Sequence, residues 1–351
     1  MMTDLSISKQ SNVFVAMSGG IDSSTSAYLL KDAGFIVTGL FMETGYTSQE
    51  DKENAQKVCD FLKVPLKTID LSKEFQAKIV ENFISEYSRG RTPNPCVLCN
   101  EKIKFGLLFD KALETGAEYI ATGHYARKRT NKTGSFDLLR GLDPKKDQSY
   151  FLYRITQKQL SKTIFPVGDL TKENVKKIAT QKNLPVKARD ESQDICFLKR
   201  NKLNNTLLED LAPHQGRIID IDTKKEVGAH QGVWNFTLGQ REGIRVGGTE
   251  QPYFVAKIDA KSNTLYVAKG KENPSLFSDT VAVDQLTWIN KTPSISASIS
   301  ASTRYRQIPV PCKIADSKIK FLKPLWAPTP GQSLVIFDKE MVLGGGIIET
   351  W

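Results

Sequence analysis

The sequence predicts an α/β protein in which a parallel-sheet domain precedes two smaller β-rich domains. Over residues 1–205, short apolar strands alternate with helical segments, and this alternation is typical of a parallel sheet covered by helices on both faces. Near residue 206 the chain changes to short strands rich in Gly, Thr and Val, and another change falls close to residue 278. We therefore expect three domains: residues 1–205, a central β-rich domain over 206–277, and a β-barrel-like domain over 278–351.

Local signals set the expected elements of the first domain. Gly34 ends the first helix, because glycine readily takes the left-handed backbone that closes a helix. Ser72 and Asn100 each stand where a helix is expected to begin, and each can cap it through a side-chain oxygen. A proline-rich loop, GRTPNPC, separates those two helices. The expected strands are 13–17, 35–42, 65–71 and 118–126; the expected helices are 24–34, 48–63, 72–88 and one beginning near residue 100.

The second half of the chain has the pattern of strands throughout. In the central domain the strand segments are GRIIDID, HQGVWNFTLGQ and YFVAKIDAKSNTLYVAKG, and the last of these turns back as a hairpin at Ser262–Asn263. In the last domain they are TVAVDQLTWI, SISASTRYR, PVPCKIA, QSLVIFD and MVLGGGII. These segments predict the two β-rich domains.

Composition excludes several classes of protein. The chain has 351 residues, of which 40% are hydrophobic and 25% charged, so it can build cores without a disulfide framework. Collagen-like, mucin-like and wholly disordered classes do not fit. There is no apolar run of about 18 residues, which a membrane span needs. The first twelve residues lack a signal-peptide core and the Arg-rich character of a transit peptide, so we expect a cytoplasmic protein with no membrane association.

The positive charge is concentrated in one part of the chain. The sequence holds 49 Lys and Arg against 39 Asp and Glu, a net charge of +10. Residues 101–200 carry a net +9, whereas residues 1–100 carry −2 and residues 201–351 carry +3. Such a basic region suits a nucleic acid, although a solvated basic face without a partner has the same composition. Its clustered members are Arg127, Lys128, Arg129, Lys132, Arg140, Lys145 and Lys146.

A phosphate-binding loop is predicted directly after the first strand. The string Ser18–Ser24, SGGIDSS, opens the first helix, where free amides and the positive end of the helix dipole favour a phosphate. Two glycines allow a sharp turn and a close ligand, and the three serine hydroxyls add donors. The string lacks the Lys of a Walker A loop and the spacing of a dinucleotide fingerprint. The alternative is a plain strand-to-helix turn.

The string SGGIDSS resembles the pyrophosphate-binding loop of the N-type ATP pyrophosphatases, which implies a HUP-like parallel-sheet domain. Further strings resemble the tRNA-specific 2-thiouridylase family, in its order and over nearly the whole chain. They are GRTPNPCVLCNEKIKF (90–105), ATGHYAR (121–127), DQSYFL (147–152), SQDICFL (192–198), GAHQGVWNFTLGQR (228–241), RYRQ (304–307) and PGQS (330–333). The resemblance implies ATP contacts by Ala16, Met17, Ser18, Gly19, Gly20, Ile21, Asp22, Ser23, Ser24, Met42 and Gly123, with Asp22 handling Mg²⁺ or pyrophosphate.

The same resemblance implies an activity. The enzyme would use ATP and Mg²⁺ to adenylate the C2 oxygen of the wobble uridine in tRNAs for Lys, Glu and Gln. Sulfur would then replace that oxygen, giving 2-thiouridine, AMP and pyrophosphate. The implied partners are the tRNA anticodon stem-loop and a persulfide donor, either a cysteine desulfurase or a sulfur relay protein.

Five cysteines divide into two groups. An odd number in a cytoplasmic protein argues against structural disulfides. Cys59 and Cys312 lie in apolar helix and strand patterns and are expected in cores. Cys96, Cys99 and Cys196 lie in Pro-rich or polar segments expected to be loops. By resemblance Cys196 carries the persulfide, while Cys99 is the second catalytic cysteine, which releases the sulfur by disulfide exchange or activates it. Asp194 either orients the Cys196 loop or forms a turn.

Cys96 departs from the family pattern, which often has Asp at this place. With Cys99 it makes a Cys-x-x-Cys motif, and with Cys196 it makes three soft ligands. Three thiolates can hold an iron–sulfur cluster with one open iron, and they are one short of a structural zinc site. We favour a persulfide mechanism with Cys96 as a bystander thiol, and keep the iron–sulfur cluster and zinc as alternatives.

The remaining candidate residues are expected at the RNA. His124 lies beside the target base by resemblance, and RNA chemistry on a base generally needs that base to leave its stack. His230 either packs or binds RNA. Arg304 and Tyr305 pair a phosphate binder with a stacking ring, and Gln332 is expected to read a base edge. The other implied contacts are Asn94, Pro95 and Cys96 around the flipped base, and Lys146, Asp147 and Gln148 along the tRNA.

Two other functions fit parts of the sequence. The first is another adenylating pyrophosphatase acting on a small molecule, but such chemistry needs neither the β-rich half nor the thiols. The second is a non-catalytic RNA-binding protein with an inactive nucleotide loop, but the string SGGIDSS and both cysteines, Cys99 and Cys196, are intact. Pyrophosphate release that depends on tRNA separates all three functions.

Overall fold

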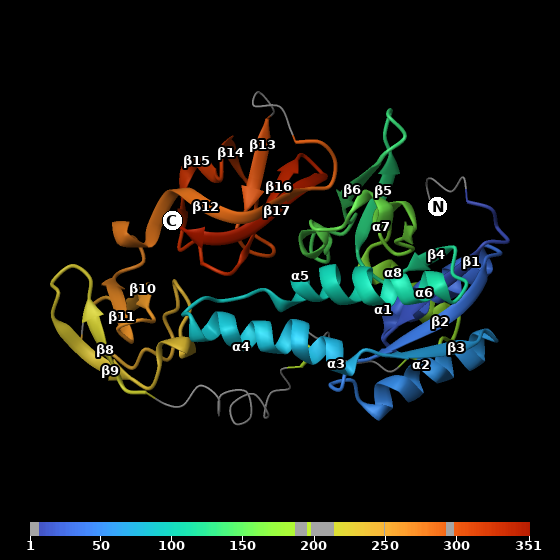
Figure 1. Ribbon diagram of the computed structural model, residues 1–351, viewed down its shortest axis with the longest axis horizontal. Helices are drawn as coiled ribbons and strands as arrows, with labels where there is room; N and C mark the ends of the chain where they lie inside the picture. The colour runs from blue at the N-terminus through green and yellow to red at the C-terminus, as the bar shows by residue number, and fades with distance from the viewer. Residues whose placement is uncertain (1–6, 187–194, 198–213, 249, 293–297) are drawn as a thin grey trace.

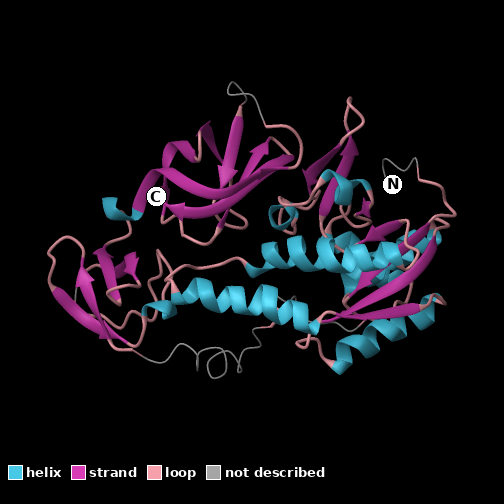
Figure 2. Ribbon diagram, in the orientation of Figure 1, coloured by secondary structure: helices cyan, strands magenta, loops and turns pink. Residues whose placement is uncertain are grey.

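The computed structural model describes residues 7–186, 195–197, 214–248, 250–292 and 298–351. Its strands form a five-stranded, a four-stranded and an eight-stranded sheet (Figure 1). The longer helices lie beside the first sheet or in an arm that extends from it, whereas the other two regions are almost entirely strand (Figure 2). No helix in these described stretches is both long and apolar enough to cross a membrane.

The first sheet is wholly parallel, as predicted. Its order is β3–β2–β1–β4–β7, and it pairs Val13 with both Val37 and Tyr119. Val13 and Val15 are fully buried in the central strand, because helices cover both faces of the sheet. The strands are β1 (Asn12–Met17), β2 (Ile36–Glu43), β3 (Leu66–Asp70), β4 (Tyr119–Ala121) and β7 (Thr163–Ile164). The flanking helices include α1 (Ile21–Asp32), α2 (Gln49–Leu62), α7 (Gln157–Ser161) and α8 (Lys172–Gln181).

A helical arm leaves the sheet after β3 and runs toward the central domain (Figure 1). It consists of α3 (Ser72–Phe75), the π-helical segment η1 (Gln76–Val80) and α4 (Glu81–Ser88). The expected cap at Ser72 is wrong by one residue, since Leu71 holds the cap position. The Asp70 carboxylate instead accepts the Ser72 backbone N–H at 2.9 Å, so the capping oxygen comes from the end of the strand.

The next helical run begins earlier than the sequence predicted. It consists of α5 (Pro95–Cys99), the π-helical segment η2 (Asn100–Leu107) and α6 (Leu108–Glu114). Asn94 caps it, accepting the Val97 N–H at 3.4 Å, and Pro at the first helical position needs no N–H partner. The expected cap at Asn100 is therefore wrong, and Cys96 and Cys99 lie on a helix rather than in a loop.

The predicted strand 118–126 is divided between two sheets. β4 ends at Ala121, and β5 (Ala126–Thr130) forms a hairpin with β6 (Phe136–Arg140). β6 pairs with the last strand of the chain through Leu138–Val342, so a hairpin of the first domain extends the sheet of the third. No local signal predicts this pairing, because its two partners are far apart along the chain.

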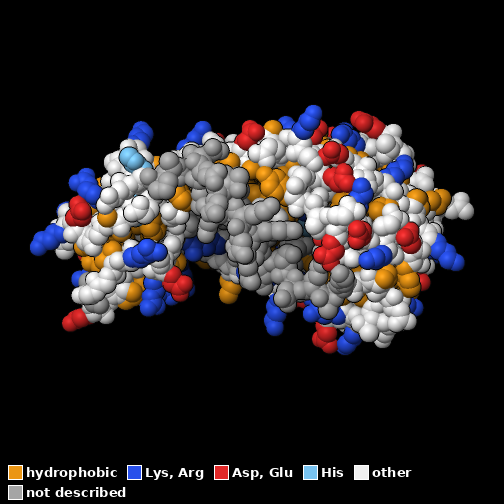
Figure 3. Space-filling model, turned by 90° about the horizontal axis from the view of Figure 1, so that it is seen from below, with side chains coloured by type: hydrophobic (Ala, Val, Ile, Leu, Met, Phe, Trp, Pro, Cys, Tyr) orange, Lys and Arg blue, Asp and Glu red, His pale blue; other side chains and the backbone are white. Residues whose placement is uncertain are grey.

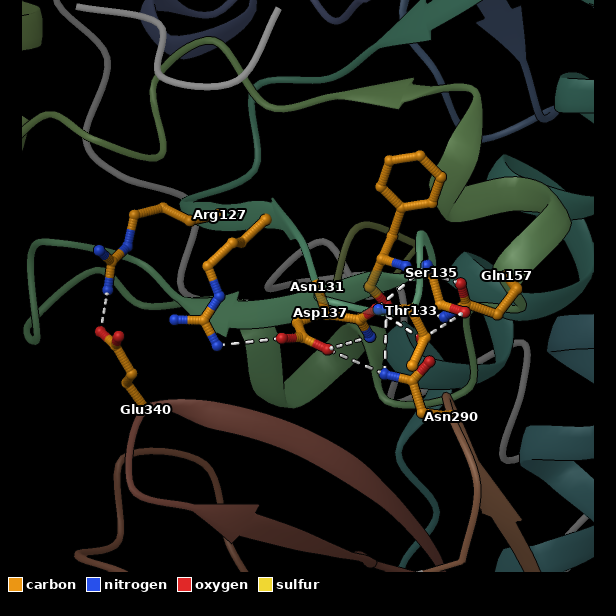
Figure 4. Close-up of polar contacts among 10 residues, drawn as sticks. Arg127, Asn131, Thr133, Ser135, Asp137, Gln157, Asn290 and Glu340 are labelled. Carbon is orange, nitrogen blue, oxygen red and sulfur yellow. Dashed lines mark hydrogen bonds and ion pairs between the residues drawn. The ribbon is translucent and has the colours of Figure 1, made fainter.

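Polar contacts fasten that hairpin (Figure 4). Arg127 binds Glu340 at 2.7 Å, and Arg129 binds the buried Asp137 at 3.0 Å. The second carboxylate oxygen of Asp137 accepts the side-chain amides of Asn131 and Asn290, both at 3.1 Å. Part of the basic cluster is thus engaged within the protein rather than offered to a partner.

The central domain is a small mixed sheet. Its order is β10–β11–β8–β9, and Ile218, Val255 and Val267 are fully buried in its core. The predicted turn at Ser262–Asn263 joins β10 to β11, with Asn263 in the left-handed region. The elements are β8 (Gly216–Asp220), β9 (Glu226–His230), η5 (Val233–Asn235), β10 (Tyr253–Asp259) and β11 (Thr264–Lys269).

The last domain is an antiparallel barrel, as predicted. Its strands follow the order β12–β15–β14–β13–β16–β17, and β12 pairs with β17 to close the ring. Cys312 is buried in this barrel and Cys59 in the first domain, as expected for core residues. The elements are η6 (Pro274–Leu276), β12 (Phe277–Trp288), β13 (Ile299–Ser302), β14 (Val310–Ala315), β15 (Lys318–Trp326), β16 (Ser333–Asp338) and β17 (Met341–Thr350).

Candidate functional site

The predicted phosphate loop joins β1 to α1. Gly20 holds the cap position of α1, and Gly19 has a φ of 71°, in the left-handed region that favours glycine. A Cβ on Gly19 would lie 2.9 Å from the Asp51 carbonyl oxygen, so the loop packs closely against α2. The hydroxyls of Ser23 and Ser24 donate to the Gly20 carbonyl at 3.0 and 2.8 Å. These two hydroxyls thus stabilise the loop itself in this structure.

Gly123 lies directly on that loop. A Cβ there would come within 2.8 Å of the Ser23 backbone nitrogen and 2.9 Å of the Asp22 carbonyl carbon. Met17 and Met42 stand near the carboxyl ends of β1 and β2, and Gly123 follows β4, so all three lie at one edge of the sheet. Ligands of open α/β sheets bind at this edge, where the strand order reverses.

The Asp22 carboxylate is held by two residues that the sequence analysis missed. Lys172, the first residue of α8, donates to its two oxygens at 2.7 and 2.8 Å. Tyr125 donates its hydroxyl at 2.7 Å, and burial together with the charge of Asp22 raises the pKa of Tyr125. The Lys172 side chain is only 11% exposed. Tyr125 falls within the string ATGHYAR, but nothing near Lys172 links it to a loop 150 residues away.

More positive charge surrounds this carboxylate. Burial lowers the pKa of Lys146, as do the positive charges of Lys172 and Arg306, while Asp22 and Asp143 raise it. The three cations come from separate segments of the chain. Together they place an excess of positive charge beside the phosphate loop, where an anion would be stabilised.

The rest of the Lys146–Gln148 segment faces inward. Asp147 is 7% exposed, and its carboxylate accepts the Arg140 guanidinium at 2.7 Å and the backbone N–H groups of Gly141 and Ser149 at 3.0 Å. The Gln148 side-chain oxygen accepts the Tyr125 backbone N–H at 3.1 Å. Asp147 and Gln148 hold the segment in place. Lys146 is half-exposed, so its charge is the one in this segment that a ligand can reach.

The three candidate thiols form a second group. Cys96 is exposed at the start of α5, Cys99 is 8% exposed on the same helix, and Cys196 is exposed. They are close enough that the charge of Cys196 raises the pKa of the other two. The Cys196 segment is anchored by its neighbour Phe197, whose ring packs 5.8 Å from Phe75 and 5.3 Å from Phe83.

Burial opposes ionisation of these thiols and Lys104 favours it. Burial raises the pKa of Cys99 to about 12. Partial loss of hydration raises the pKa of Cys96 and of Cys196, although both residues reach the surface, and the Lys104 ammonium lowers the pKa of all three thiols. Burial, and to a smaller extent the positive charge of Lys104, holds the pKa of His124 well below its usual value. This histidine is therefore neutral at pH 7. Lys104, which lies five residues after Cys99 in η2, was not among the residues that the sequence motifs indicated.

The thiols do not fit an iron–sulfur cluster or a zinc site in this arrangement. Among the described residues, which include all five cysteines, no three His, Cys, Asp or Glu side chains are grouped so that they could hold a metal ion. We therefore derive no step through a metal bound to Cys96, Cys99 and Cys196.

Comparisons with known proteins match nearly the whole chain. The family models that match are described as "tRNA methyl transferase HUP domain" over residues 11–200, "tRNA methyl transferase PRC-barrel domain" over 204–269 and "Aminomethyltransferase beta-barrel domain" over 278–348. The "tRNA-specific 2-thiouridylase MnmA" of Nitrosomonas europaea is 44% identical over 97% of this chain and 98% of that protein. Those of Proteus mirabilis and Psychromonas ingrahamii are 43% and 44% identical, each over 99% of both chains.

This chain belongs to the tRNA-specific 2-thiouridylase family. A solved structure, a predicted subunit of a tRNA methyltransferase from Methanocaldococcus jannaschii, is 18% identical with a TM-score of 0.32, over 49% of this chain and 76% of that one.

The remaining candidate residues of this family member have partners within the protein. The Arg304 guanidinium donates to the Ala327 and Leu238 carbonyls at 2.7 and 3.2 Å, which ties the barrel to the central domain. The Tyr305 ring packs 4.5 Å from the ring of Phe151. Their roles at RNA, and those of Asn94 and Pro95, stay predictions.

The histidines are placed differently from each other. His124 follows β4, and its Nδ1 lies 2.9 Å from the Thr122 hydroxyl. It is half-buried and neighbours Gly123 on the phosphate loop. His230 is 4% exposed, and its Nδ1 accepts the Gly232 N–H at 2.9 Å, so it packs in the central domain. Asp194 lies outside the described residues.

Proposed function

We propose that this protein is a tRNA 2-thiouridylase that adenylates the wobble uridine at O2 and then replaces that oxygen with sulfur. One arrangement carries the proposal. Gly123 packs on the phosphate loop. The charge of Lys104 lowers the pKa of the adjacent His124, and it also lowers the pKa of Cys96, Cys99 and Cys196. A single short segment therefore links a nucleotide site to a group of thiols. The thiols favour sulfur transfer over the methyl transfer that the model descriptions print.

The phosphate loop would carry out the first half of the reaction. The uridine O2 attacks the α-phosphorus of ATP, an O–P bond forms, and pyrophosphate leaves. Free amides at the start of α1 bind phosphate oxygens, and Lys172 and Lys146 neutralise the leaving pyrophosphate. The Asp22 carboxylate would hold Mg²⁺, which would neutralise part of the triphosphate charge. Lys172 exchanges its ion pair with Asp22 for one with the phosphates.

Two cysteine thiols are enough to balance the atoms and electrons of the second half of the reaction. The terminal sulfur of a Cys196 persulfide attacks C2, AMP leaves with the original oxygen, and the base is joined to Cys196 through an S–S bond. The Cys99 thiolate attacks the Cys196 sulfur, forming a Cys99–Cys196 disulfide, and the electron pair of the broken bond goes to the 2-thiouridine. A thiol reductant supplies two electrons to restore both cysteines. Cys96 is a bystander in this scheme, and neutral His124 lies beside the base.

The substrate partner is a tRNA anticodon stem-loop, with tRNAs for Lys, Glu and Gln as the expected set. The persulfide would come from a cysteine desulfurase or a sulfur relay protein. Figure 3 shows Lys and Arg side chains on one face of the molecule, interspersed with Asp and Glu. Lys and Arg side chains attract an RNA backbone.

The test is single-turnover thiolation of tRNA with an unmodified wobble uridine, using anaerobically purified protein of measured iron content. ATP, Mg²⁺ and a persulfide-loaded donor are supplied. We expect 2-thiouridine, AMP and pyrophosphate in equal amounts from iron-free protein. Activity that tracks iron and is lost on chelation would replace the persulfide scheme by a cluster. Pyrophosphate release that does not need tRNA would indicate a small-molecule substrate instead, and no turnover at all would indicate a non-catalytic RNA-binding protein.

A further inference from the structure

The segment that leads into the thiol helix α5 has unusually few hydrogen-bond donors of its own. It begins with Thr92 and contains Pro93 and Pro95, neither of which has a backbone N–H. The carbonyls of Thr92 and Pro93 precede the helix and belong to no sheet. Since Pro93 is buried, the carbonyls of this segment need hydrogen-bond donors from elsewhere in the chain.

Gln332 of the barrel supplies that donor. Its side-chain amide donates to the Thr92 carbonyl at 2.8 Å and to the Pro93 carbonyl at 3.3 Å. The Thr92 N–H donates in turn to the Pro330 carbonyl at 2.9 Å. Gly331 has a φ of 90°, and a Cβ on it would lie 2.9 Å from the Thr92 carbonyl, so only glycine lets the two backbones approach this closely.

The next residue of the barrel, Ser333, reaches the other end of α5 indirectly. The buried Tyr150 donates its hydroxyl to the Ser333 carbonyl at 2.7 Å. The adjacent Phe151 carbonyl accepts the Asn100 side-chain amide at 3.1 Å, and Asn100 directly follows Cys99. Gln332 therefore bonds the segment directly before this five-residue helix, and Ser333 bonds the Tyr150–Phe151 segment that holds the residue directly after it.

We propose that Gln332 and Ser333 form a clamp that positions α5, and with it Cys99, for sulfur transfer. The proposal rests on the proposed function, in which Cys99 attacks the Cys196 sulfur. Gln332 and Tyr150 are positioning residues, because neither touches the reacting atoms. The prolines of the segment keep it stiff, so a displacement at Gln332 is passed on to the helix rather than absorbed. A shift of about 1 Å in a reacting group costs roughly a hundredfold in rate.

The test uses Gln332→Met and Tyr150→Phe, each of which removes one anchor and keeps the volume similar. The matched control is Gln56→Met, because Gln56 is exposed on α2 and its side-chain amide donates to Asp60 at 2.7 Å, away from the clamp. We expect both clamp variants to slow single-turnover sulfur transfer by about ten- to a hundredfold at saturating tRNA. Pyrophosphate release and the tRNA Kd should stay within about twofold of wild type, and Gln56→Met should transfer sulfur normally.

A second readout does not depend on thiolation. Alkylation of each cysteine, followed by mass spectrometry, reports the exposure of Cys99 against that of Cys59 and Cys312, which are buried outside the clamp. We expect faster alkylation of Cys99 alone in the two clamp variants. Wild-type protein that does not thiolate tRNA would refute the proposed function while this readout still tests the clamp.

Other outcomes overturn the clamp. A raised tRNA Kd with an unchanged rate at saturation would make Gln332 an RNA contact, as the sequence analysis expected. Equal acceleration at Cys312 would mean that the barrel is generally destabilised. Unchanged alkylation and unchanged transfer in both variants would show that α5 holds its place without these anchors.

Discussion

Asp22 shows how a single residue of the loop depends on distant partners. Its carboxylate is bonded to Lys172 and Tyr125, so the loop residue that a sequence motif points to is only one part of the charge arrangement. The Lys172 ammonium can neutralise the carboxylate before nucleotide binds and the phosphates afterwards. Because Lys172 would neutralise first the carboxylate and then the phosphates, changing this residue tests both roles at once.

Lys172→Met should slow pyrophosphate release by about a hundredfold, because it removes a preorganised charge from the leaving group. Binding of tRNA should be unchanged, since the Lys172 side chain is almost wholly buried. Rapid quench of ATP turnover measures the effect. Lys177→Met is the matched control on the same helix, where Lys177 pairs with Glu173 at the surface. Equal rates for both variants would exclude a role for Lys172.

The thiol of Cys99 should ionise only at high pH. Burial raises its pKa to about 12, so the thiolate fraction is small at pH 7 and rises about tenfold with each pH unit. Its alkylation rate should follow that slope from pH 7 to 10 without levelling off. Lys104→Met removes the charge that lowers this pKa, and should slow alkylation by about three- to tenfold at every pH in that range. A plateau below pH 9 would contradict the assigned pKa.

Among the elements, the end of β4 matters most for the nucleotide site. Gly123 leaves no room for a side chain between this segment and the loop of α1. Its φ is not in the left-handed region, so space rather than backbone strain explains the glycine.

Gly123→Ala should therefore push the loop away and reduce adenylation by at least about tenfold, with the thermal unfolding midpoint lowered by only a few degrees. Pyrophosphate release and a melting curve measure the two effects. Gly247→Ala is the control, because a Cβ there meets no atom within 4 Å. A variant with normal adenylation would mean that the loop adjusts to the methyl group.

Elements built from contiguous residues were predictable, and those that depend on distant partners were not. The phosphate loop, the parallel strands and the hairpin at Asn263 follow from signals a few residues long. Asn94 rather than Asn100 caps α5, because a proline at the first helical position moved the start of the helix forward. No local pattern connects Gln332 with Thr92 or Lys172 with Asp22. Lys172 meets Asp22 only when the first domain folds, and Gln332 meets Thr92 only when the barrel packs against that domain.

At the scale of the whole molecule, the count of 49 Lys and Arg residues overstates the number of cations available to RNA. Arg127, Arg129 and Arg140 each bind a carboxylate of the protein. The remaining cations still exceed the anions, so phosphate contacts should contribute most of the binding energy.

The tRNA Kd should therefore weaken steeply with salt, by about a thousandfold or more between 50 and 200 mM if six or more phosphates are contacted. A tRNA outside the expected set should show the same slope, because phosphate contacts carry no sequence information. Fluorescence anisotropy over a salt series measures both. A flat response would show that RNA binding does not depend on the basic residues.

The pairing of β6 with β17 also has a consequence for synthesis. The hairpin is complete once residue 140 leaves the ribosome, but its partner begins at Met341, close to the end of the chain. At about 5–20 residues per second the hairpin waits for roughly 10–40 s with one edge unpaired. Unpaired edges invite association with other chains. The nascent protein thus passes through an interval in which its own barrel does not yet cover that edge.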